Sequence, residues 1–337
     1  MANLFKRAAI FSDLHVGQKS NSQIHNEDCL RYIDWFIDLV KTNNCDTILF
    51  LGDFHHNRNS INIQTMDYSL RILEKLDSVG CRIMVIPGNH DLFYKDKRAI
   101  SSIKYMSKFK NIQLINDQYS EGDVCFVPWL IGEEHKNIRK IKDRYVMGHF
   151  ELPKFMMNSM VEMPDHGELR REDFGHVEKV FTGHFHKRQT QNNIHYIGNA
   201  FPHNFADAWD NDRGAVILEW GKEPQFINWT EGPEYRVMNL AQLIDDTDKY
   251  LNDRTYARVN LDISISYEEA NFIKETMAKQ YNPREISLIP HKQELDFNGV
   301  QVDSSFESVD QIVMNQIESI DTNSYDRKLL MEIYTGL

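Results

Sequence analysis

Residues 180–188 read VFTGHFHKR: an apolar run stops at Gly183, and His184 and His186 follow on either side of Phe185. Because alternate side chains of an extended backbone point the same way, the two histidines could serve one site together. The alternative is a solvated strand end, since a single histidine is more often a surface or core residue than a metal ligand. The sequence elsewhere distinguishes these two interpretations.

The same pattern, an apolar run that stops at a glycine or a polar residue, recurs along the first half of the chain. Short continuous apolar runs bounded by turn residues are typical of strands buried on both faces. Residues 26–43 and 64–79, which lie between the early runs, carry apolar side chains at helical spacing. Alternating strands and helices predict an α/β fold with a parallel sheet and right-handed crossovers. The further runs are AAIFS before Asp13, TILFL before Gly52, RIMVIP before Gly88 and RYVM before Gly148.

In a parallel sheet the residues just past the carboxyl ends of the strands meet at one edge, where ligands bind. Glycines next to such positions let the backbone turn sharply and let a metal ion or a phosphate approach closely. Carboxylate, amide oxygen and imidazole suit manganese, iron or zinc, and the missing thiolates favour the harder metals. Seven donors exceed what one open ion takes, so two ions sharing a carboxylate fit better. The side chains at these ends are Asp13, His15, Asp53, Asn89, His149, His184 and His186, with His90 beside them.

Composition sets the broad class of the protein. The chain has 337 residues, 41 % hydrophobic and 26 % charged, enough for one large core plus an appended domain. No apolar run approaches the ~20 residues needed to cross a bilayer, and the N-terminal apolar stretch is too short for a signal peptide. Cys29, Cys45, Cys81 and Cys125 are widely spaced, which suits unpaired thiols. We therefore expect an intracellular, cytoplasmic protein with no membrane association.

The formal net charge of −12 argues, over the whole chain, against a nucleic-acid partner. If many of the acids bind metal ions or lie in an acidic tail, the field at one face can still be positive. Lysines and arginines do cluster, with a solvated surface as the alternative interpretation of each cluster. The clusters are Lys95, Lys97 and Arg98; Lys136, Arg139, Lys140, Lys142 and Arg144; Arg170 and Arg171; and Lys187 and Arg188.

The character of the sequence changes near residue 222. A loop-like stretch is followed by residues 255–266, 267–281 and 283–289, which read as strand, helix and strand. The last segment carries apolar stripes at helical spacing, which must be buried against this second unit or against a partner. The expected domains are residues 1–221, residues 222–295 as a small α+β cap, and residues 296–337 as a C-terminal helical tail.

Five short motifs occur along the chain in the order Asp-x-His, Gly-Asp, Gly-Asn-His-Asp, Gly-His and Gly-His-x-His. Together they resemble the motifs of the calcineurin-like metallophosphoesterase superfamily. The resemblance covers residues 8–200. Within the superfamily, the chain looks most like the SbcD-type nucleases, especially the nuclease subunits of tailed-phage recombination complexes. The stretches that carry this likeness are SDLHVG, PGNHD, VPWL (with Pro128 and Trp129), and YIGNAFPHNF followed by NDRGAVIL. This implies the metallophosphoesterase fold, with mostly parallel sheets flanked by helices.

The resemblance also implies a dinuclear metal centre with two divalent ions, Mn²⁺ first and Mg²⁺ as the alternative. His184 and His186 would each face a different ion, which neighbours can do when the ions lie ~3.5 to 4 Å apart. The implied ligands are Asp13, His15 and His186 for one ion; Asn89, His149 and His184 for the other; and Asp53 as the bridge.

Three further residues are implied to act on the substrate. His90 would contact the scissile phosphate or protonate the leaving group, and Asp91 would hold the His90 ring in the useful tautomer. The alternative for His90 is a metal ligand or a support for one. The run GDFHHNR departs from the usual family pattern and contains His55 and His56. Its register favours His56 as a residue that places DNA, with an exposed surface position as the alternative for either histidine.

The leading hypothesis is a metal-dependent DNA nuclease, acting on duplex ends as an exonuclease and on single strands or hairpins as an endonuclease, in recombination and double-strand-break processing. No P-loop motif occurs, so the chain does not bind ATP in that way. The resemblance implies an SbcC-like coiled-coil ABC ATPase docked on the C-terminal helices. It also implies a homodimer formed through helices near the early motifs. Residues 26–43 and 64–79 are the candidates, with packing on the core as the alternative for their apolar faces. If the protein is phage-encoded, it acts in the host cytoplasm.

Two alternatives use the same scaffold. One is a phosphatase or cyclic-nucleotide phosphodiesterase. Protein phosphatases of the superfamily carry Gly-Asn-His-Glu and a later Arg-Gly, whereas Asp91 and HHNRN stand here. The other is a catalytically inactive scaffold subunit. Such relatives lose metal ligands, and every implied ligand position is filled in this chain.

Overall fold

The computed structural model describes residues 3–157, 161–167, 169–263 and 265–290. It divides the chain into two compact units, Met1–Tyr235 and Arg236–Leu337. The first unit extends past residue 221, where the sequence places the boundary, because strand β14 (Gln225–Asn228) pairs with β13 (Gly214–Glu219) inside the first unit. The expected helical tail, residues 296–337, lies outside the described residues.

The first sheet of the first unit contains the early apolar runs. Four of its strands are parallel, and β13 and β14 join antiparallel at one side. The strand order is β14, β13, β1 (Arg7–Phe11), β2 (Thr47–Phe50), β3 (Arg82–Val85) and β6 (Ile112–Leu114).

The second sheet contains the later runs. Its four central strands are parallel, and an antiparallel strand closes each side. The apolar runs alone indicate one parallel sheet, whereas the five site-bearing strands are divided between two sheets, in agreement with the mostly parallel sheets that the resemblance implies. The order in the second sheet is β11 (Gln189–Gln191), β12 (Ile194–Tyr196), β10 (Lys179–Gly183), β9 (Tyr145–His149), β8 (Val124–Val127) and β7 (Tyr119–Glu121).

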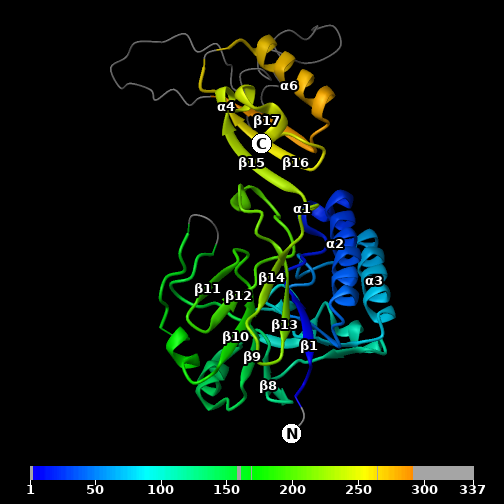
Figure 1. Cartoon of the computed structure of the whole chain (residues 1–337), viewed down its shortest axis with the longest axis vertical. Helices are drawn as coiled ribbons and strands as arrows, with labels where there is room; N and C mark the ends of the chain where they lie inside the picture. The colour runs from blue at the N-terminus through cyan, green and yellow to red at the C-terminus, as the bar shows by residue number, and fades with distance from the viewer. Residues whose placement is uncertain (1–2, 158–160, 168, 264, 291–337) are drawn as a thin grey trace, which may run out of the picture. The chain divides into compact units, whose positions relative to one another are not determined.

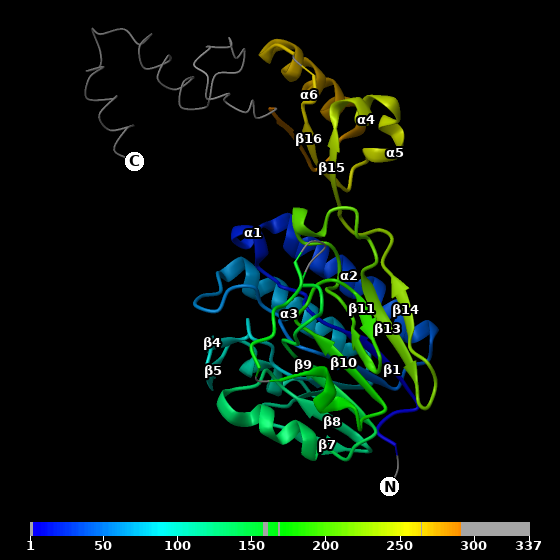
Figure 2. The ribbon, with the colours of Figure 1, turned by 90° about the vertical axis from the view of Figure 1, so that its left-hand side faces the viewer.

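The predicted helices form where expected. They are α2 (Gln23–Thr42) and α3 (Ile63–Ser78), which lie side by side on one flank of the first unit (Figures 1 and 2). Each begins at a residue whose side chain accepts a backbone N–H bond, Ser22 for α2 and Asn62 for α3. The shorter elements are α1 (Gln18–Asn21), the 3₁₀ helices η1 (Lys104–Lys108), η2 (Gly132–Lys140), η3 (Arg171–Phe174) and η4 (Phe205–Asp207), and the β4 (Leu92–Tyr94) and β5 (Lys97–Ser101) hairpin.

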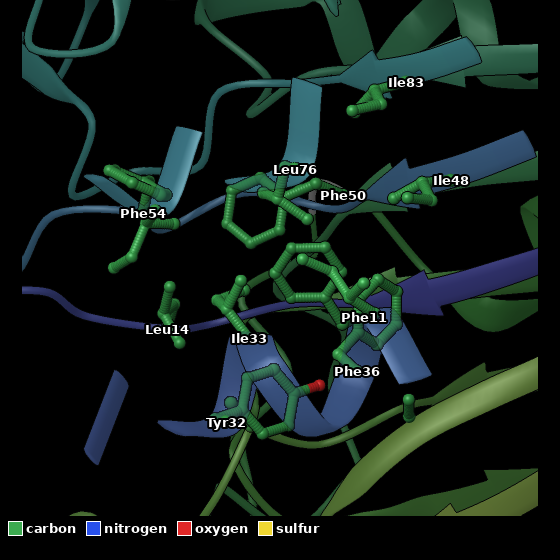
Figure 3. Packing of buried hydrophobic residues seen from close by; sticks show 14 of the residues in the cluster. Phe11, Leu14, Tyr32, Ile33, Phe36, Ile48, Phe50, Phe54, Leu76 and Ile83 are labelled. Atoms are coloured by element: carbon green, nitrogen blue, oxygen red, sulfur yellow. The ribbon is translucent and has the colours of Figure 1, made fainter. Parts of the chain in front are cut away.

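Burial on both faces explains why the strands read as continuous apolar runs. In β1, Phe11 packs against α2 residues such as Tyr32 and Phe36 (Figure 3), while Ile10 packs between the two sheets with Met147 of β9. Successive strand residues face opposite sides, so each side chain finds an apolar layer. A third layer covers the other face of the second sheet. The strands are therefore held firmly, and the loops at their ends are fixed with them.

The second unit has its own small core. Its sheet has the order β15 (Glu234–Asn239), β16 (Thr255–Asn260) and β17 (Glu285–Ile289), and β16 pairs parallel with β17. The crossover between β16 and β17 is α6 (Tyr267–Tyr281), which begins with a capping box of Ser266 and Glu269. These are the strand, helix and strand predicted for residues 255–289. The remaining helices are α4 (Leu240–Asp245) and α5 (Thr247–Tyr250).

Two predictions from composition can be compared with the structure. The four cysteines, all within the described residues, are unpaired, as predicted. None of the helices in the described residues combines the length and the apolar character that crossing a bilayer requires.

Candidate metal centre

The structure brings together all seven predicted ligand side chains at the carboxyl ends of β1, β2, β3, β9 and β10. Two strand ends of the second sheet therefore meet three of the first. We describe the side chains around Asn89 as the Asn89 half and those around His186 as the His186 half. Asp53 lies between the two halves.

In the Asn89 half, two imidazoles converge on one carboxamide oxygen. Asn89 Oδ1 lies 3.0 Å from His149 Nε2 and 2.9 Å from His184 Nδ1. The opposite ring nitrogens have partners of their own: His149 Nδ1 lies 2.7 Å from the Leu51 carbonyl oxygen, and His184 Nε2 lies 3.1 Å from Glu151 Oε2. Outer partners of this kind fix the ring orientation and leave the inner nitrogen free to bind a cation.

In the His186 half, two imidazoles face each other directly. His15 Nε2 lies 3.1 Å from His186 Nε2, and it lies 3.9 Å from Asp13 Oδ1. Asp13 and His15 are buried, whereas the His186 side chain keeps a quarter of its surface exposed. Ligand atoms at these separations are what a single cation draws together in a protein site.

Asp53 Oδ2 is within reach of both halves, at 3.7 Å from His15 Nε2 and 3.4 Å from His149 Nε2. Its other oxygen, Oδ1, accepts the backbone N–H of His90 at 2.7 Å. Burial raises the pKa of the Asp53 carboxyl, but the His149 imidazole, together with His90 and His184, outweighs burial and holds that pKa well below its usual range. Asp53 is therefore an anion shared by two sets of donors.

The site stores backbone strain. Four candidate ligands have left-handed φ angles: Asp13 (53°), His15 (52°), Asp53 (59°) and His184 (88°). Such conformations are rare for residues other than glycine and cost ~1–3 kcal/mol each. The expectation of an extended backbone from His184 to His186 is thus wrong, because the chain turns at His184. This turn sends the His184 ring towards Asn89 and the His186 ring towards His15.

Two glycines are required by the close approach of the loops. A Cβ on Gly88 would lie 2.2 Å from Asp53 Oδ1, and a Cβ on Gly183 would lie 2.1 Å from Ser12 Oγ and 2.7 Å from Asp13 Oδ2. No side chain fits at such distances. The predicted role of glycine beside the donors therefore has a direct steric basis at these two positions.

His90 lies at the site, and its ring meets the ring of His15 at 4.9 Å between centroids. Its Nδ1 lies 2.7 Å from the His56 carbonyl oxygen. The expectation that Asp91 orients the His90 ring is wrong. The buried Asp91 carboxylate instead accepts backbone N–H bonds, of 2.8–3.2 Å, from Asp53, Phe54, His55 and Gly88. An ionised carboxylate accepts hydrogen bonds and donates none, so it can satisfy all four backbone donors. Asp91 therefore ties the loop that carries Asp53 to the loop that carries Asn89.

His55 and His56 have different environments, and neither is fully exposed. His55 is buried, with Nδ1 2.9 Å from Ser102 Oγ and Nε2 3.0 Å from Ser69 Oγ. His56 faces the site, with Nδ1 3.4 Å from His15 Nδ1 and its ring stacked on that of His90. Burial lowers the pKa of His56 to about 4, so its neutral imidazole can accept a hydrogen bond from His15.

Sequence reasoning missed two side chains at the site and left a third open. Glu151 lies two residues after His149 and contacts His184. Because alternate side chains of an extended backbone point the same way, this spacing could have identified Glu151 from the sequence. His203 lies beside His15 and His186 and follows no apolar run, so it gave no strand-end signal. Trp129 belongs to a motif of the resemblance, with plain core as the alternative, and its ring lies 5.1 Å from that of His184 between centroids.

The donor set fits divalent cations. Two buried carboxylates, one amide oxygen and four imidazoles lie with their ligand atoms facing one another. Buried anions need counter-charge, and imidazole with carboxylate is the donor combination of borderline transition metals. Two groups of donor atoms lie within 4.8 Å of one another. The first contains one ring nitrogen each of His149 and His184 and one carboxylate oxygen of Asp53. The second contains one donor atom each of Asp13, His15 and Asp53.

A two-sheet α/β unit with carboxylates, an amide and imidazoles gathered at its parallel strand ends has the architecture of a metal-dependent hydrolase. The chain belongs to the calcineurin-like phosphoesterase family, whose model matches residues 6–188, more than half of the chain. The superfamily predicted from the five motifs is thereby confirmed, and so is its fold.

Individual proteins resemble this chain over parts of their length. Exonuclease subunit 1 of Enterobacteria phage T4 is 28 % identical over 195 residues, 55 % of this chain and 57 % of the phage protein. The SbcD component of the nuclease SbcCD of Escherichia coli (strain K12) is 29 % identical over 80 residues, 24 % of this chain and 20 % of that protein. The solved Pseudomonas putida nuclease MPE overlaps 56 % of this chain and 66 % of its own at 16 % identity and a TM-score of 0.30. The matches thus span little more than half of the phage relative and a fifth of the bacterial one.

Proposed function

We propose that this chain is a nuclease that hydrolyses DNA phosphodiesters with two divalent ions. The observation that carries the proposal is the position of Asp53 Oδ2, within 3.7 Å of His15 Nε2 on one side and 3.4 Å of His149 Nε2 on the other. A carboxylate oxygen between two sets of donors is the arrangement a bridging ligand requires. The family membership supports hydrolysis of a phosphoester, and the names of the relatives support a nuclease.

The proposed ligands are those implied by the sequence. When bound, the two ions would neutralise the phosphodiester, lower the pKa of a water molecule and stabilise the departing oxygen. Mn²⁺ is proposed ahead of Mg²⁺, because imidazole donors suit a transition metal better. The ligands are Asp13, His15 and His186 in one half, Asn89, His149 and His184 in the other, and Asp53 between them.

His90 is the proposed catalytic residue on the substrate side. Because its Nδ1–H donates to the His56 carbonyl oxygen, Nε2 is the atom left for the substrate. Protonated at Nε2, the ring can donate to a phosphate oxygen or give a proton to the leaving group. His56 stacks on this ring and is proposed to keep it in place, with DNA contact as its second role.

DNA as the substrate is supported by the hairpin that follows Asp91 directly. Phe93, Tyr94, Lys95 and Lys97 on this hairpin are exposed. Lys97 Nζ lies 5.8 Å from the centre of the Tyr94 ring. Exposed lysines with aromatic rings suit a nucleic-acid strand, through phosphate contacts and base stacking. The chain's net charge of −12 does not oppose this, since the hairpin is locally basic.

Two partners are part of the proposal. An SbcC-like ATPase would dock on residues 296–337, and a second copy of the chain would pack on α2 and α3. Ile63 and Leu70 of α3 and Ile24 of α2 are exposed apolar side chains on these helices, and such side chains suit a contact surface. The ATPase docking predicts that a chain truncated after residue 303 keeps Mn²⁺-dependent cleavage of single-stranded DNA and loses ATP-stimulated activity.

The test is cleavage of end-labelled duplex and single-stranded DNA by the purified chain with Mn²⁺, with and without the substitution His90→Ala. The proposal predicts cleavage by the wild type, its loss with EDTA, and a strong decrease in the variant. Turnover of small phosphomonoesters without DNA cleavage would contradict it in favour of a phosphatase. A folded chain that retains no transition ion would contradict it in favour of an inactive scaffold.

A further inference from the structure

His203 is a buried histidine in the segment between β12 and η4, and its backbone is held on both sides. Its N–H donates to Asp207 Oδ2 at 2.9 Å, and its carbonyl oxygen accepts the Tyr235 hydroxyl at 2.9 Å. Its relative exposure is 0 %. The position of the ring is therefore set by the surrounding structure.

The His203 ring is unusual because neither nitrogen has a hydrogen-bond partner within the described residues. Buried polar nitrogens are almost always satisfied, since leaving one unpaired costs its full desolvation penalty. An imidazole ring that is not protonated on both nitrogens keeps one nitrogen with a lone pair. A buried, unpaired lone pair of this kind points to a ligand.

The neighbours of His203 indicate which ligand it is. The His203 ring lies 5.4 Å from that of His15 and 5.3 Å from that of His186, between centroids. One donor nitrogen from each of the three histidines falls within 4.8 Å of the other two. His25 also touches the ring, but its Nε2 is used on the His15 carbonyl oxygen at 2.9 Å. The three inward-facing imidazoles therefore define one cation position.

We propose that His203 supplies a third imidazole to the ion held by Asp13, His15 and His186, an inference that rests on the proposed metal centre. The His186 half then offers three ring nitrogens, against two in the Asn89 half. Nitrogen donors favour transition metals over Mg²⁺, which prefers oxygen. His203 thus makes the two positions unequal and biases the His186 half towards Mn²⁺, Fe²⁺ or Zn²⁺.

The first test measures Mn²⁺ binding to the full chain by equilibrium dialysis with elemental analysis, alone and against excess Mg²⁺. His203→Gln should weaken one of the two Mn²⁺ ions by at least ~10-fold, leave the other unchanged, and let Mg²⁺ compete better at the weakened position. The matched control is His195→Gln, which removes another buried ring that stacks on Phe181 at 5.0 Å and bonds Thr190 Oγ1 at 3.0 Å, outside the site. Equal binding by both variants and the wild type overturns the inference.

A second measurement needs no stable variant. In wild-type protein with ¹⁵N-labelled histidine rings, a titration with Cd²⁺ should shift one His203 nitrogen together with those of His15 and His186. A His203 signal that stays fixed while the other two move overturns the inference.

The two proposals fail separately. Wild-type protein that binds two ions and does not cut DNA contradicts the proposed function and leaves His203 as a ligand. Wild-type protein that cuts DNA, with His203→Gln binding both ions as tightly as the wild type, contradicts only the role of His203. Wild-type protein that binds no ion contradicts both.

Discussion

The two halves of the candidate metal centre hold their imidazoles in different ways. In the Asn89 half each ring has an outer partner, the Leu51 carbonyl for His149 and the Glu151 carboxylate for His184. In the His186 half, His15 Nδ1 meets only another imidazole, His56 Nδ1, at 3.4 Å, and within the described residues His203 has no outer partner at all. Partners other than histidine thus orient the rings of one half, whereas in the other half the rings meet one another, in the His15–His186 and His15–His56 pairs.

This difference has a physical consequence. A ring with an outer partner presents its lone pair before the ion arrives, so its half is preorganised. In the His186 half, the inner nitrogens of His15 and His186 face each other at 3.1 Å, and within the described residues both nitrogens of His203 are unpaired, so an ion would satisfy them. We expect the Asn89 half to depend on its outer partners and the His186 half to gain more order from its ion.

The largest effect should come from the residue shared by the two halves. Asp53→Asn removes the negative charge that both halves share, so we expect Mn²⁺ to be lost from both positions. Cleavage should fall by at least ~10⁴-fold, because the ions supply several kcal/mol of charge stabilisation. Metal analysis and single-turnover cleavage measure this. Asp28→Asn is the control, another buried aspartate, which lies on α2 and pairs with Arg31. Retention of both ions by Asp53→Asn would show that the halves are independent.

The next effect separates catalysis from metal binding. His90→Ala should lower kcat by ~10²–10⁴-fold with both ions kept, because the ring acts on the substrate in our proposal. His176, an exposed histidine with Nε2 2.9 Å from the Ile141 carbonyl oxygen, provides the control substitution. If His90→Ala lost an ion, the ring would belong to the ligand set.

Glu151→Ala should affect one half only. Removing the outer partner of His184 should weaken one ion by ~10–100-fold and leave the other unchanged. Mn²⁺ titration of the two positions measures this, with Glu133→Ala, an exposed glutamate paired to Lys136, as the control. Equal weakening at both positions would remove the distinction between the halves.

Asp91→Asn tests the loop-tying role. An amide places an N–H₂ group where the carboxylate accepts backbone donors, so we expect a loss of ~1–3 kcal/mol in the free energy of unfolding. Urea unfolding of the metal-free protein measures it. Unchanged stability with a shifted pH profile of cleavage would instead return Asp91 to a role on His90.

The smallest effect is a pH dependence of the metal-free protein. Burial lowers the pKa of His149, but Asp53 outweighs burial and raises it to about 9, above its ordinary value of 6.5. A raised folded pKa gives stability that is complete below pH about 6.5 and is lost as pH rises through about 9. We expect the Tm in EDTA to fall over this window and the fall to be absent in His149→Asn. With Mn²⁺ bound the ring carries no such proton, so the fall should shrink. A flat Tm for the metal-free wild type would contradict the His149–Asp53 pairing.

Much of this arrangement could be predicted from the sequence, because strand ends are visible in it. The five apolar runs mark β1, β2, β3, β9 and β10, and all seven predicted ligands lie at their ends. The apolar runs by themselves could not predict the division into two sheets, since a strand buried on both faces looks the same whether a helix or a second sheet covers it. Periodicity reports burial and not the covering partner.

The sequence does not reveal residues whose role depends on tertiary contacts and not on their place in a motif or at a strand end. The motif pairs Asp91 with its chain neighbour His90, but the Asp91 carboxylate reaches the backbone of residues 53–55, which only the fold brings near. His203 lies in the YIGNAFPHNF stretch that contributes to the resemblance, but it follows a proline in a loop, and no apolar strand run ends beside it to indicate a ligand. The left-handed turn at His184 is also set by tertiary contacts, among them the bond from its N–H to Asp13.

We propose that two cations bind on either side of Asp53, each held by one half of the site. The most direct measurement is a crystal structure of the Mn²⁺-loaded protein with anomalous diffraction at the manganese edge. We expect two peaks ~3.5 to 4 Å apart that share an Asp53 oxygen, one against Asn89 and His184 and the other against His15 and His186. A single peak, or peaks remote from Asp53 in a fully loaded crystal, would contradict it.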